Sequence, residues 1–210
     1  MFAGRYVNLL RKLDDLAART ANFVYLEVGT FNGVRAANML DYFLSAGSNK
    51  TASYIGFDLF EDMTHDMSKA EFSKSTLPAA TAAVQDVFQK TVGKKYGARF
   101  KGAQLFKGNT QETLKAWKED PASLKPNFIF IDGGHSLETI ASDFKNLEHL
   151  IATENVFLMD DYYINRTDFG CHSLVEQINR EGKYVGLPLV PIDHIPKNGL
   201  DIQVVTVYPA

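Results

Sequence analysis

Three apolar segments constrain the fold more than any other feature of the sequence. They are FVYLEV at residues 23–28, NFIFID at 127–132 and NVFLMD at 155–160. Each is apolar almost throughout, whereas a strand with one face in water alternates apolar and polar residues. Such runs predict strands buried on both faces of a mostly parallel sheet. Helical patterns lie between them, so we expect an α/β, Rossmann-like, doubly wound sheet with helices on both faces.

The remaining elements follow from periodicity and from capping residues. Seven strands are expected, at residues 23–29, 52–60, 103–109, 127–134, 155–163, 183–192 and 201–209. Helices are expected at 5–19, 34–46, 110–120, 136–151 and 172–182, with two more within 64–92. Thr110 and Ser136 are the expected N-caps, Pro78 separates the two helices within 64–92, and Gly182 ends the last helix. The last two strands follow each other closely, so they are expected to pair antiparallel at one edge.

We expect residues 1–210 to form a single domain. Within it, residues 1–20 supply an N-terminal helix that can serve a homodimer contact, and residues 61–95 form a helical insertion that can cover the substrate. The net charge of -3 and the pI near 5.9 argue against a nucleic-acid partner. No stretch approaches the roughly 20 apolar residues of a membrane span. Cys171 is the single cysteine, and the amphipathic N-terminus does not resemble a secretion signal, so a cytoplasmic location is expected.

Acids stand at the ends of four predicted strands. They are Glu27, Asp58, Asp132 and the pair Asp160-Asp161. In an open parallel sheet, ligands bind beyond the carboxyl ends of the strands, so these carboxylates are expected around one site. An acid beside an apolar core is costly unless something pairs with it, which makes the recurrence informative.

The turn after the first strand indicates the kind of ligand. Gly29 permits a sharp turn, and Gly33 permits close contact between helix and ligand. The dinucleotide pattern GxGxxG is absent, because Phe31 and Val34 occupy the other positions. A carboxylate just before the turn suits a cation better than a pyrophosphate, and Asp58 could accept hydrogen bonds from ribose hydroxyls. An adenosine ligand with positive charge in place of phosphates is S-adenosylmethionine.

These motifs resemble a known family. ExGxxxG at residues 27–33, the acid ending the second strand, and IDGGHS at 131–136 resemble class I S-adenosylmethionine-dependent methyltransferases. IDGGHS followed by MDD at 159–161 is most similar to the small-molecule and sugar O-methyltransferase branch, macrocin-like, and the catechol O-methyltransferase type is similar at the same points. The resemblance covers about residues 22–165.

The resemblance implies roles for particular residues. Glu27, Gly29 and Gly33 would line the methionine part of the cofactor, and Asp58 would hold the ribose. Residues 109–111 would face the adenine, although Thr110 can also act simply as a helix cap. The implied cofactor-binding set is Glu27, Gly29, Thr30, Asn32, Gly33, Asp58, Asn109, Thr110, Gln111, Asp132 and His135.

A divalent metal is a second expectation. Asp132, Asp160 and Asp161 would converge from neighbouring strands and raise one another's pKa. An all-oxygen set suits Mg²⁺, with Mn²⁺ or Ca²⁺ as alternatives. Related metal-dependent methyltransferases place Asp, and then Asp-Asp or Asp-Asn, at these positions, and this sequence matches that pattern. The alternative is that one of the tandem acids faces solvent and no metal binds.

The candidate catalytic residues are His135 and Asp132. His135, with a reference pKa of about 6.5, could take a proton at neutral pH. The catechol type has a lysine at this offset, and some sugar methyltransferases have an acid one position earlier, where Gly134 stands. His135 could instead contact the cofactor or cap the helix. Residues 162–166, with 61–80, are the expected substrate wall.

The sequence therefore predicts transfer of a methyl group from S-adenosylmethionine to a hydroxyl of a small molecule, sugar or polyphenol-like, aided by Mg²⁺. The alternatives are a metal-independent methyltransferase and a related hydroxylase of the same branch. From other classes come an NAD-dependent dehydrogenase, disfavoured by the missing glycine, and a non-catalytic cofactor-binding module.

Overall fold

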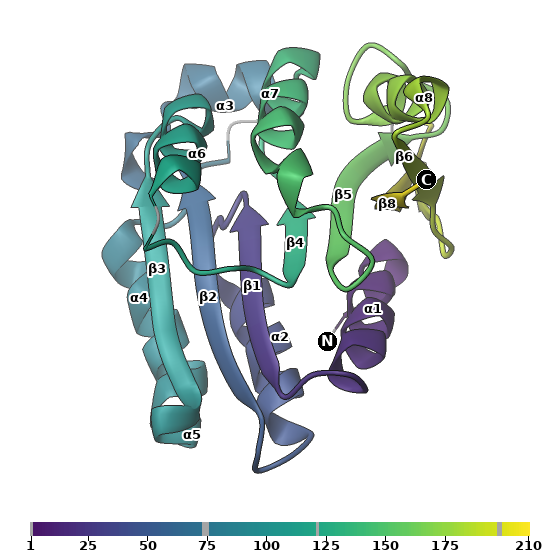
Figure 1. Cartoon of the computed structure of the whole chain (residues 1–210). Helices are drawn as coiled ribbons and strands as arrows, with labels where there is room; N and C mark the ends of the chain where they lie inside the picture. The colour runs from purple at the N-terminus through teal and green to yellow at the C-terminus, as the bar shows by residue number, and fades with distance from the viewer. Residues whose placement is uncertain (1, 73–75, 121, 197–198) are drawn as a thin grey trace.

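The computed structural model describes residues 2–72, 76–120, 122–196 and 199–210. Its centre is a sheet in the order β3-β2-β1-β4-β5-β8-β6, with β7 paired to β8 (Figure 1). Neighbouring strands from β3 to β5 are parallel, and β8 runs antiparallel to β5, β6 and β7. The strands are β1 (Asn22–Val28), β2 (Thr51–Asp58), β3 (Phe100–Lys107), β4 (Phe128–Ile131), β5 (Val156–Tyr163), β6 (Tyr184–Pro188), β7 (Asp193–Ile195) and β8 (Leu200–Pro209).

This architecture confirms the expected Rossmann-like α/β fold. The pairing of the last two long strands is antiparallel, as expected, and β8 lies between β5 and β6. The short strand β7 was not predicted. It forms within a segment that contains several prolines, and it is an element only because β8 lies beside it.

Helices cover both faces of the sheet. The first core contains residues of α1, α2 and α4, and the second contains residues of α6, α7 and α8. Alternate residues of β1 divide between the two cores, with Phe23 and Tyr25 in the first and Val24 and Leu26 in the second. The helices are α1 (Val7–Ala17), α2 (Val34–Ser45), α3 (His65–Phe72), α4 (Thr81–Phe88), α5 (Lys94–Tyr96), α6 (Thr110–Glu119), α7 (Leu137–Leu147) and α8 (His172–Glu181).

The structure confirms two of the three helix-terminal residues predicted from the sequence. Ser136 caps α7 by accepting a hydrogen bond from the Thr139 amide, and Gly182 ends α8 in the left-handed conformation. The prediction for Thr110 was wrong, because Asn109 caps α6 and its side chain accepts from the Gln111 amide. Thr110 is instead the first residue of the helix. Asn and Thr both favour the N-cap position, and the backbone that leaves β3 places Asn109 there.

The two glycines after β1 hold the site together. Gly29 has φ of 88°, and a Cβ there would collide with the backbone of Asp132 and Gly133 beyond β4. Gly33 has φ of 71°, and a Cβ there would press on Val84 of α4. The glycine-lined turn therefore lets the loops after β1 and β4 approach each other closely.

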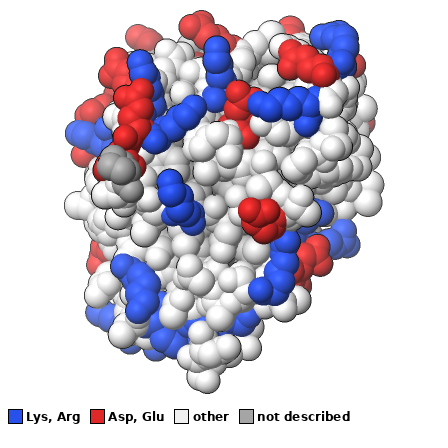
Figure 2. Space-filling view, in the orientation of Figure 1, with Lys and Arg blue, Asp and Glu red and all other residues white. Residues whose placement is uncertain are grey.

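The surface carries charges of both signs. Figure 2 shows Lys and Arg beside Asp and Glu over the upper part of this face, with uncharged surface between them. Among the described residues, no helix is long and apolar enough to cross a membrane.

Candidate active site

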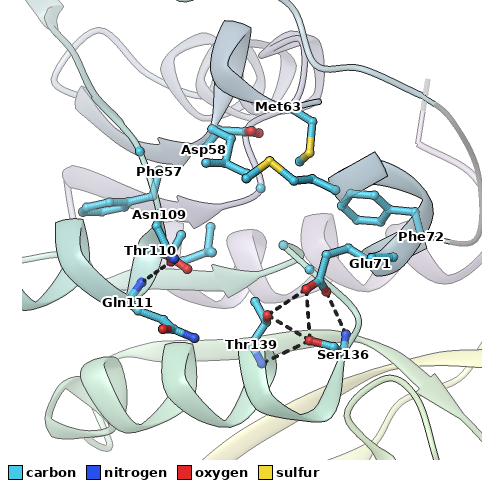
Figure 3. A pocket seen from close by; sticks show the side chains of 18 of the residues that line it. Phe57, Asp58, Met63, Glu71, Phe72, Asn109, Thr110, Gln111, Ser136 and Thr139 are labelled. Carbon is cyan, nitrogen blue, oxygen red and sulfur yellow. Dashed lines mark hydrogen bonds between the residues drawn. The ribbon is translucent and has the colours of Figure 1, made fainter. Parts of the chain in front are cut away.

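Two adjoining cavities lie at the carboxyl ends of the parallel strands. The first, of about 360 Å³, is bounded by the ends of β1 and β2, the N-termini of α6 and α7, and α3 (Figure 3). The second, of about 290 Å³, is bounded by the turn after β1, the first turn of α2 and the loop after β4. Gly29, Asp58, Met63 and Phe72 line both cavities, so the two spaces lie side by side.

Asp58 lies where the cavities meet. Its carboxylate accepts hydrogen bonds from the amide of Phe31 at 2.7 Å and the amide of Phe60 at 3.1 Å. Burial nevertheless raises the pKa of Asp58. Phe31 and Phe60 both have positive φ, as does Asp161, and these are the only such non-glycine residues in the described chain. Backbone strain of this kind typically marks a functional site, and here all of it borders the strand ends.

The residues expected at the adenine end line the first cavity. Asn109, Thr110 and Gln111 face it from the start of α6. Phe57 at the end of β2 borders this cavity but is fully buried, with its ring stacked on Phe106 at 4.8 Å between centroids. The structure thus gathers polar groups from α6 at one end of the cavity, next to the apolar core.

Helix α3 covers the first cavity through Glu71. Its carboxylate accepts hydrogen bonds from the Ser136 amide at 2.9 Å, the Ser136 hydroxyl at 3.1 Å and the Thr139 hydroxyl at 3.0 Å (Figure 3). This places a negative charge at the N-terminus of α7, where the helix dipole favours it. Helix α3 is therefore attached to the N-terminus of α7 by Glu71, a residue that the sequence patterns did not single out.

Glu27 occupies a different place from the one expected. It is 1% exposed and lines neither cavity. Its carboxylate accepts hydrogen bonds from the hydroxyls of Tyr25 at 2.7 Å and Tyr54 at 2.6 Å, and from Nε and Nη2 of Arg35 at 3.2 and 3.0 Å. Glu27 therefore positions Arg35, which lines the second cavity with Thr30 and Asn32. Gly33 lines neither cavity.

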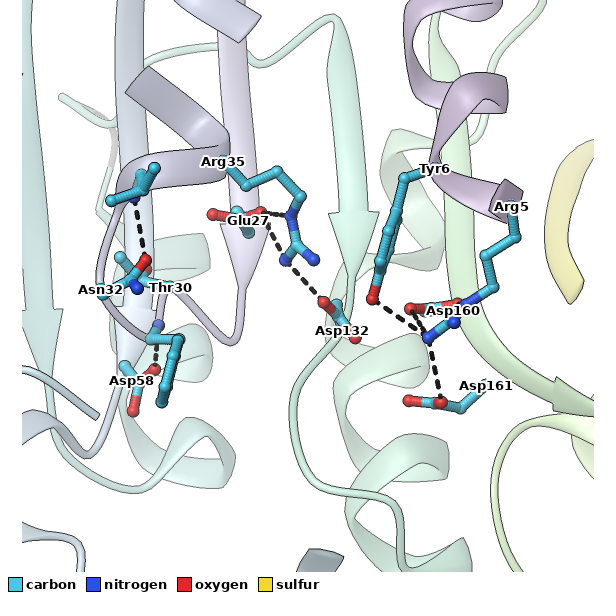
Figure 4. Close-up of polar contacts among 12 residues, drawn as sticks. Arg5, Tyr6, Glu27, Thr30, Asn32, Arg35, Asp58, Asp132, Asp160 and Asp161 are labelled. Atoms are coloured by element: carbon cyan, nitrogen blue, oxygen red, sulfur yellow. Dashed lines mark hydrogen bonds and ion pairs between the residues drawn. The ribbon is translucent and has the colours of Figure 1, made fainter. Parts of the chain in front are cut away.

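Asp132, which follows β4, and the acids Asp160 and Asp161 of β5 separate into two groups (Figure 4). Asp132 contacts Nη2 of Arg35 at 2.5 Å, whereas Asp160 accepts from Nε and Nη2 of Arg5 at 2.6 and 2.9 Å. Burial and the other acids raise the pKa of Asp132 well above its usual value, with Arg35 opposing them. Burial works to raise the pKa of Asp160 as well, but the charge and hydrogen bonds of Arg5 lower it overall.

Asp132, His135 and Asp161 form the cluster that can hold a metal. One potential ligand atom from each lies within 4.8 Å of the others. This set departs from the expected Asp132, Asp160 and Asp161, because Arg5 binds Asp160 and the imidazole of His135 approaches Asp161 instead. Two carboxylates and an imidazole are suitable donors for a divalent cation. A cation there would also relieve the repulsion that raises the pKa of Asp132, so the residues fit such an ion.

His135 is held from both sides of its ring. Its Nε2 lies 2.8 Å from Oδ2 of Asp161, and its Nδ1 lies 3.3 Å from the hydroxyl of Tyr163. The rings of Phe72 and Phe169 pack edge-on against it at 4.9 and 5.5 Å. An imidazole in this setting has a fixed orientation at the wall of the second cavity.

The N-terminal segment supplies two site residues that the sequence did not reveal. Arg5 binds Asp160 and also Asp193, and Tyr6 lines the second cavity. Burial, with Asp132 and Asp160 nearby, raises the pKa of Tyr6, so its phenol stays protonated. These contacts cannot be predicted from local sequence patterns, since Arg5 and Asp160 are 155 positions apart. Arg35 was easier to find, because it follows the glycine turn directly on the first turn of α2.

The fold and these cavities together define the class of protein. It is a Rossmann-like α/β protein with its ligand site beyond the carboxyl ends of the parallel strands. The chain belongs to the methyltransferase-domain family, whose model matches residues 26–162. Membership confirms the class expected from ExGxxxG and IDGGHS, an S-adenosylmethionine-dependent methyltransferase.

Solved structures agree on the fold. The O-methyltransferase NovP superposes with a TM-score of 0.66 at 17% identity, over 95% of this chain and 78% of that one. The calicheamicin methyltransferase CalS11 gives 0.57 at 13% identity, over 96% and 79%. MycE, a methyltransferase of mycinamycin biosynthesis solved with Mg and SAH, gives 0.52 at 13% identity, over 97% of this chain and 49% of that one. No curated protein sequence matches the chain significantly.

Proposed function

We propose that this protein transfers a methyl group from S-adenosylmethionine to a hydroxyl of a small molecule such as a sugar or a polyphenol. The observation that carries the proposal is that two cavities of different character adjoin at Asp58. One is lined by polar groups of α6, and the other contains the charged residues Arg35 and Asp132. A nucleoside with a charged amino-acid tail requires this combination.

The first cavity would take the nucleoside. Asp58 would accept hydrogen bonds from the ribose hydroxyls, since its two backbone contacts leave acceptor capacity on the carboxylate. Asn109 and Gln111 would face the edge of the adenine. The sulfonium and the methionine part would then extend past Gly29 into the second cavity.

The chemistry is an in-line displacement at the methyl carbon. The C–S bond breaks, the C–O bond forms, and the hydroxyl loses a proton. His135 is the group proposed to take that proton, because its orientation is set by Asp161 and an imidazolium would be stabilised by the same carboxylate. Phe72 and Phe169 exclude water from this side of the imidazole.

In the metal-assisted route a divalent cation would be held by Asp132, His135 and Asp161, and His135 would then be a ligand; its role as base belongs to the metal-free route. When bound, the cation would lower the pKa of the acceptor hydroxyl and orient the oxygen. The metal-free route remains the second candidate, and one observation favours it. Arg5 and Arg35 already place positive charge against Asp160 and Asp132, so part of the acidic charge is neutralised by the chain itself.

The test begins with binding. Calorimetry with S-adenosylhomocysteine and with NAD should give binding of the first alone, and binding of NAD alone would overturn the proposal. A methylation screen over hydroxyl-bearing small molecules, with and without EDTA, should then give a product. Loss of turnover in EDTA that Mg²⁺ or Mn²⁺ restores supports the metal route, whereas unchanged turnover supports the metal-free one.

Variants assign the base. His135→Ala should lower turnover by about 10²-fold or more while cofactor affinity stays within a few-fold. Asp15→Asn, an exposed acid on α1, is the matched control and should behave as the parent protein. A near-native rate for His135→Ala would exclude it as the base.

A further inference from the structure

Arg35 has a side chain that the contacts within the chain use only in part. Its Nε and Nη2 bind Glu27, and Nη2 also contacts Asp132. Among the described residues, no hydrogen bond uses Nη1. The rings of Tyr6 and Phe130 lie 5.0 Å from the guanidinium carbon, so the plane of the group is fixed. Figure 4 shows Arg35 with Glu27 and Asp132.

The guanidinium remains charged and reaches the second cavity. An arginine guanidinium keeps its positive charge at physiological pH, and Glu27 and Asp132 both lie against it. The side chain keeps 24% exposure, and Arg35 lines the cavity. In the described part of the lining it is the one Lys or Arg, beside the acids Asp58 and Asp132.

Charge complementarity indicates what this arrangement would bind. The guanidinium of Arg35 lies between the carboxyl groups of Glu27 and Asp132. The amino-acid tail of S-adenosylmethionine carries a carboxylate together with an ammonium and the sulfonium, so it offers groups of both signs to this arrangement. A guanidinium with donors to spare is the preferred partner for a carboxylate, since its N–H groups match the two oxygens. Arg35 also lies on the first turn of α2, where the helix dipole favours an anion.

We propose that Arg35 binds the carboxylate of the amino-acid part of S-adenosylmethionine and so makes the site selective for the complete cofactor. Glu27 and Tyr6 are positioning residues in this arrangement. Glu27 fixes one edge of the guanidinium, and the ring of Tyr6 fixes its plane, which directs Nη1 toward the ligand. The inference rests on the proposed function and adds the group by which this chain recognises the cofactor tail.

Three ligands separate the tail from the nucleoside. S-adenosylhomocysteine has the carboxylate and the ammonium, its decarboxylated analogue has the ammonium alone, and 5′-methylthioadenosine has neither. In the parent protein we expect calorimetry to show S-adenosylhomocysteine bound roughly 10- to 100-fold more tightly than the decarboxylated analogue, the range for a charge-assisted hydrogen bond. Equal affinity for these two would overturn the proposal without any variant.

Substitution then assigns the effect to Arg35. Arg35→Met should remove most of that preference while methylthioadenosine affinity stays within about threefold. Arg35→Lys, which keeps the charge and leaves Glu27 and Asp132 partnered, should retain only part of it. Arg11→Met, at an exposed arginine of α1, is the control and should keep the full preference. A preference that persists in both Arg35 variants would overturn the assignment.

The outcomes also separate this inference from the proposed function. If none of the three ligands binds the parent protein, the proposed function fails. If all three bind with similar affinity, the methyltransferase proposal stands and the role of Arg35 is wrong.

Discussion

Asp143 of α7 allows a quantitative prediction about stability. It is 0% exposed, and neither carboxylate oxygen has a hydrogen-bond partner among the described residues. Burial raises the pKa of Asp143 from 3.8 to about 7, and the nearby Thr110 opposes this rise in part. The Thr110 hydroxyl makes no well-formed hydrogen bond to either carboxylate oxygen of Asp143. The folded protein therefore holds a proton on this group over a pH range in which the unfolded chain has lost it.

The sign and size of the effect follow from that difference. Because the folded state binds the extra proton, the free energy of unfolding falls as pH rises between about 4 and 7. Each pKa unit corresponds to about 1.4 kcal/mol, so the shift amounts to about 4 kcal/mol above pH 7. Replacing Asp143 by Asn removes the charge with little change of shape. The variant should match the parent near pH 4 and exceed it by a few kcal/mol at pH 8.

Urea unfolding followed by circular dichroism, at intervals from pH 4 to pH 8, measures this difference. The comparison between parent and variant is needed because other acids, Asp132 among them, also titrate abnormally. Asp15→Asn, at an exposed position, should leave the pH profile unchanged. Parallel profiles for the parent and Asp143→Asn would refute the reasoning, since they would mean that the buried carboxyl carries no unusual proton.

Two further predictions concern the walls of the site. Asp160→Asn should cost about 1.5–3 kcal/mol of unfolding free energy, because Arg5 loses its charged hydrogen bonds to Asp160 and keeps Asp193, yet it should change Mn²⁺ affinity less than Asp161→Asn does. Calorimetry with Mn²⁺ checks the second part, and equal losses would return Asp160 to the ligand set. Glu71→Gln should weaken S-adenosylhomocysteine binding by roughly 10-fold through loss of the charged contacts to α7. Calorimetry beside the exposed control Glu154→Gln measures this, and unchanged affinity would remove Glu71 from the account of the cover.

The elements of the fold could be predicted from local patterns. Runs such as FVYLEV identify buried strands because their side chains must be apolar on both faces, and this holds wherever the strand lies in the sheet. Capping is also local, as Ser136 shows. The exceptions have a shared cause. The strand β7 and the choice of Asn109 over Thr110 depend on what lies alongside, which no short window of sequence contains.

The sequence by itself determined which end of the sheet carries the acids, because the period of a strand and the direction of parallel pairing place every carboxyl terminus at one edge. Only the tertiary structure decided how those acids are shared. Arg5 binds Asp160, His135 approaches Asp161, and Arg35 lies between Glu27 and Asp132. The physical reason is that a buried charge must find a partner, and the partner is whichever opposite charge or donor the folded chain brings within a few ångströms, however far away it lies in the sequence.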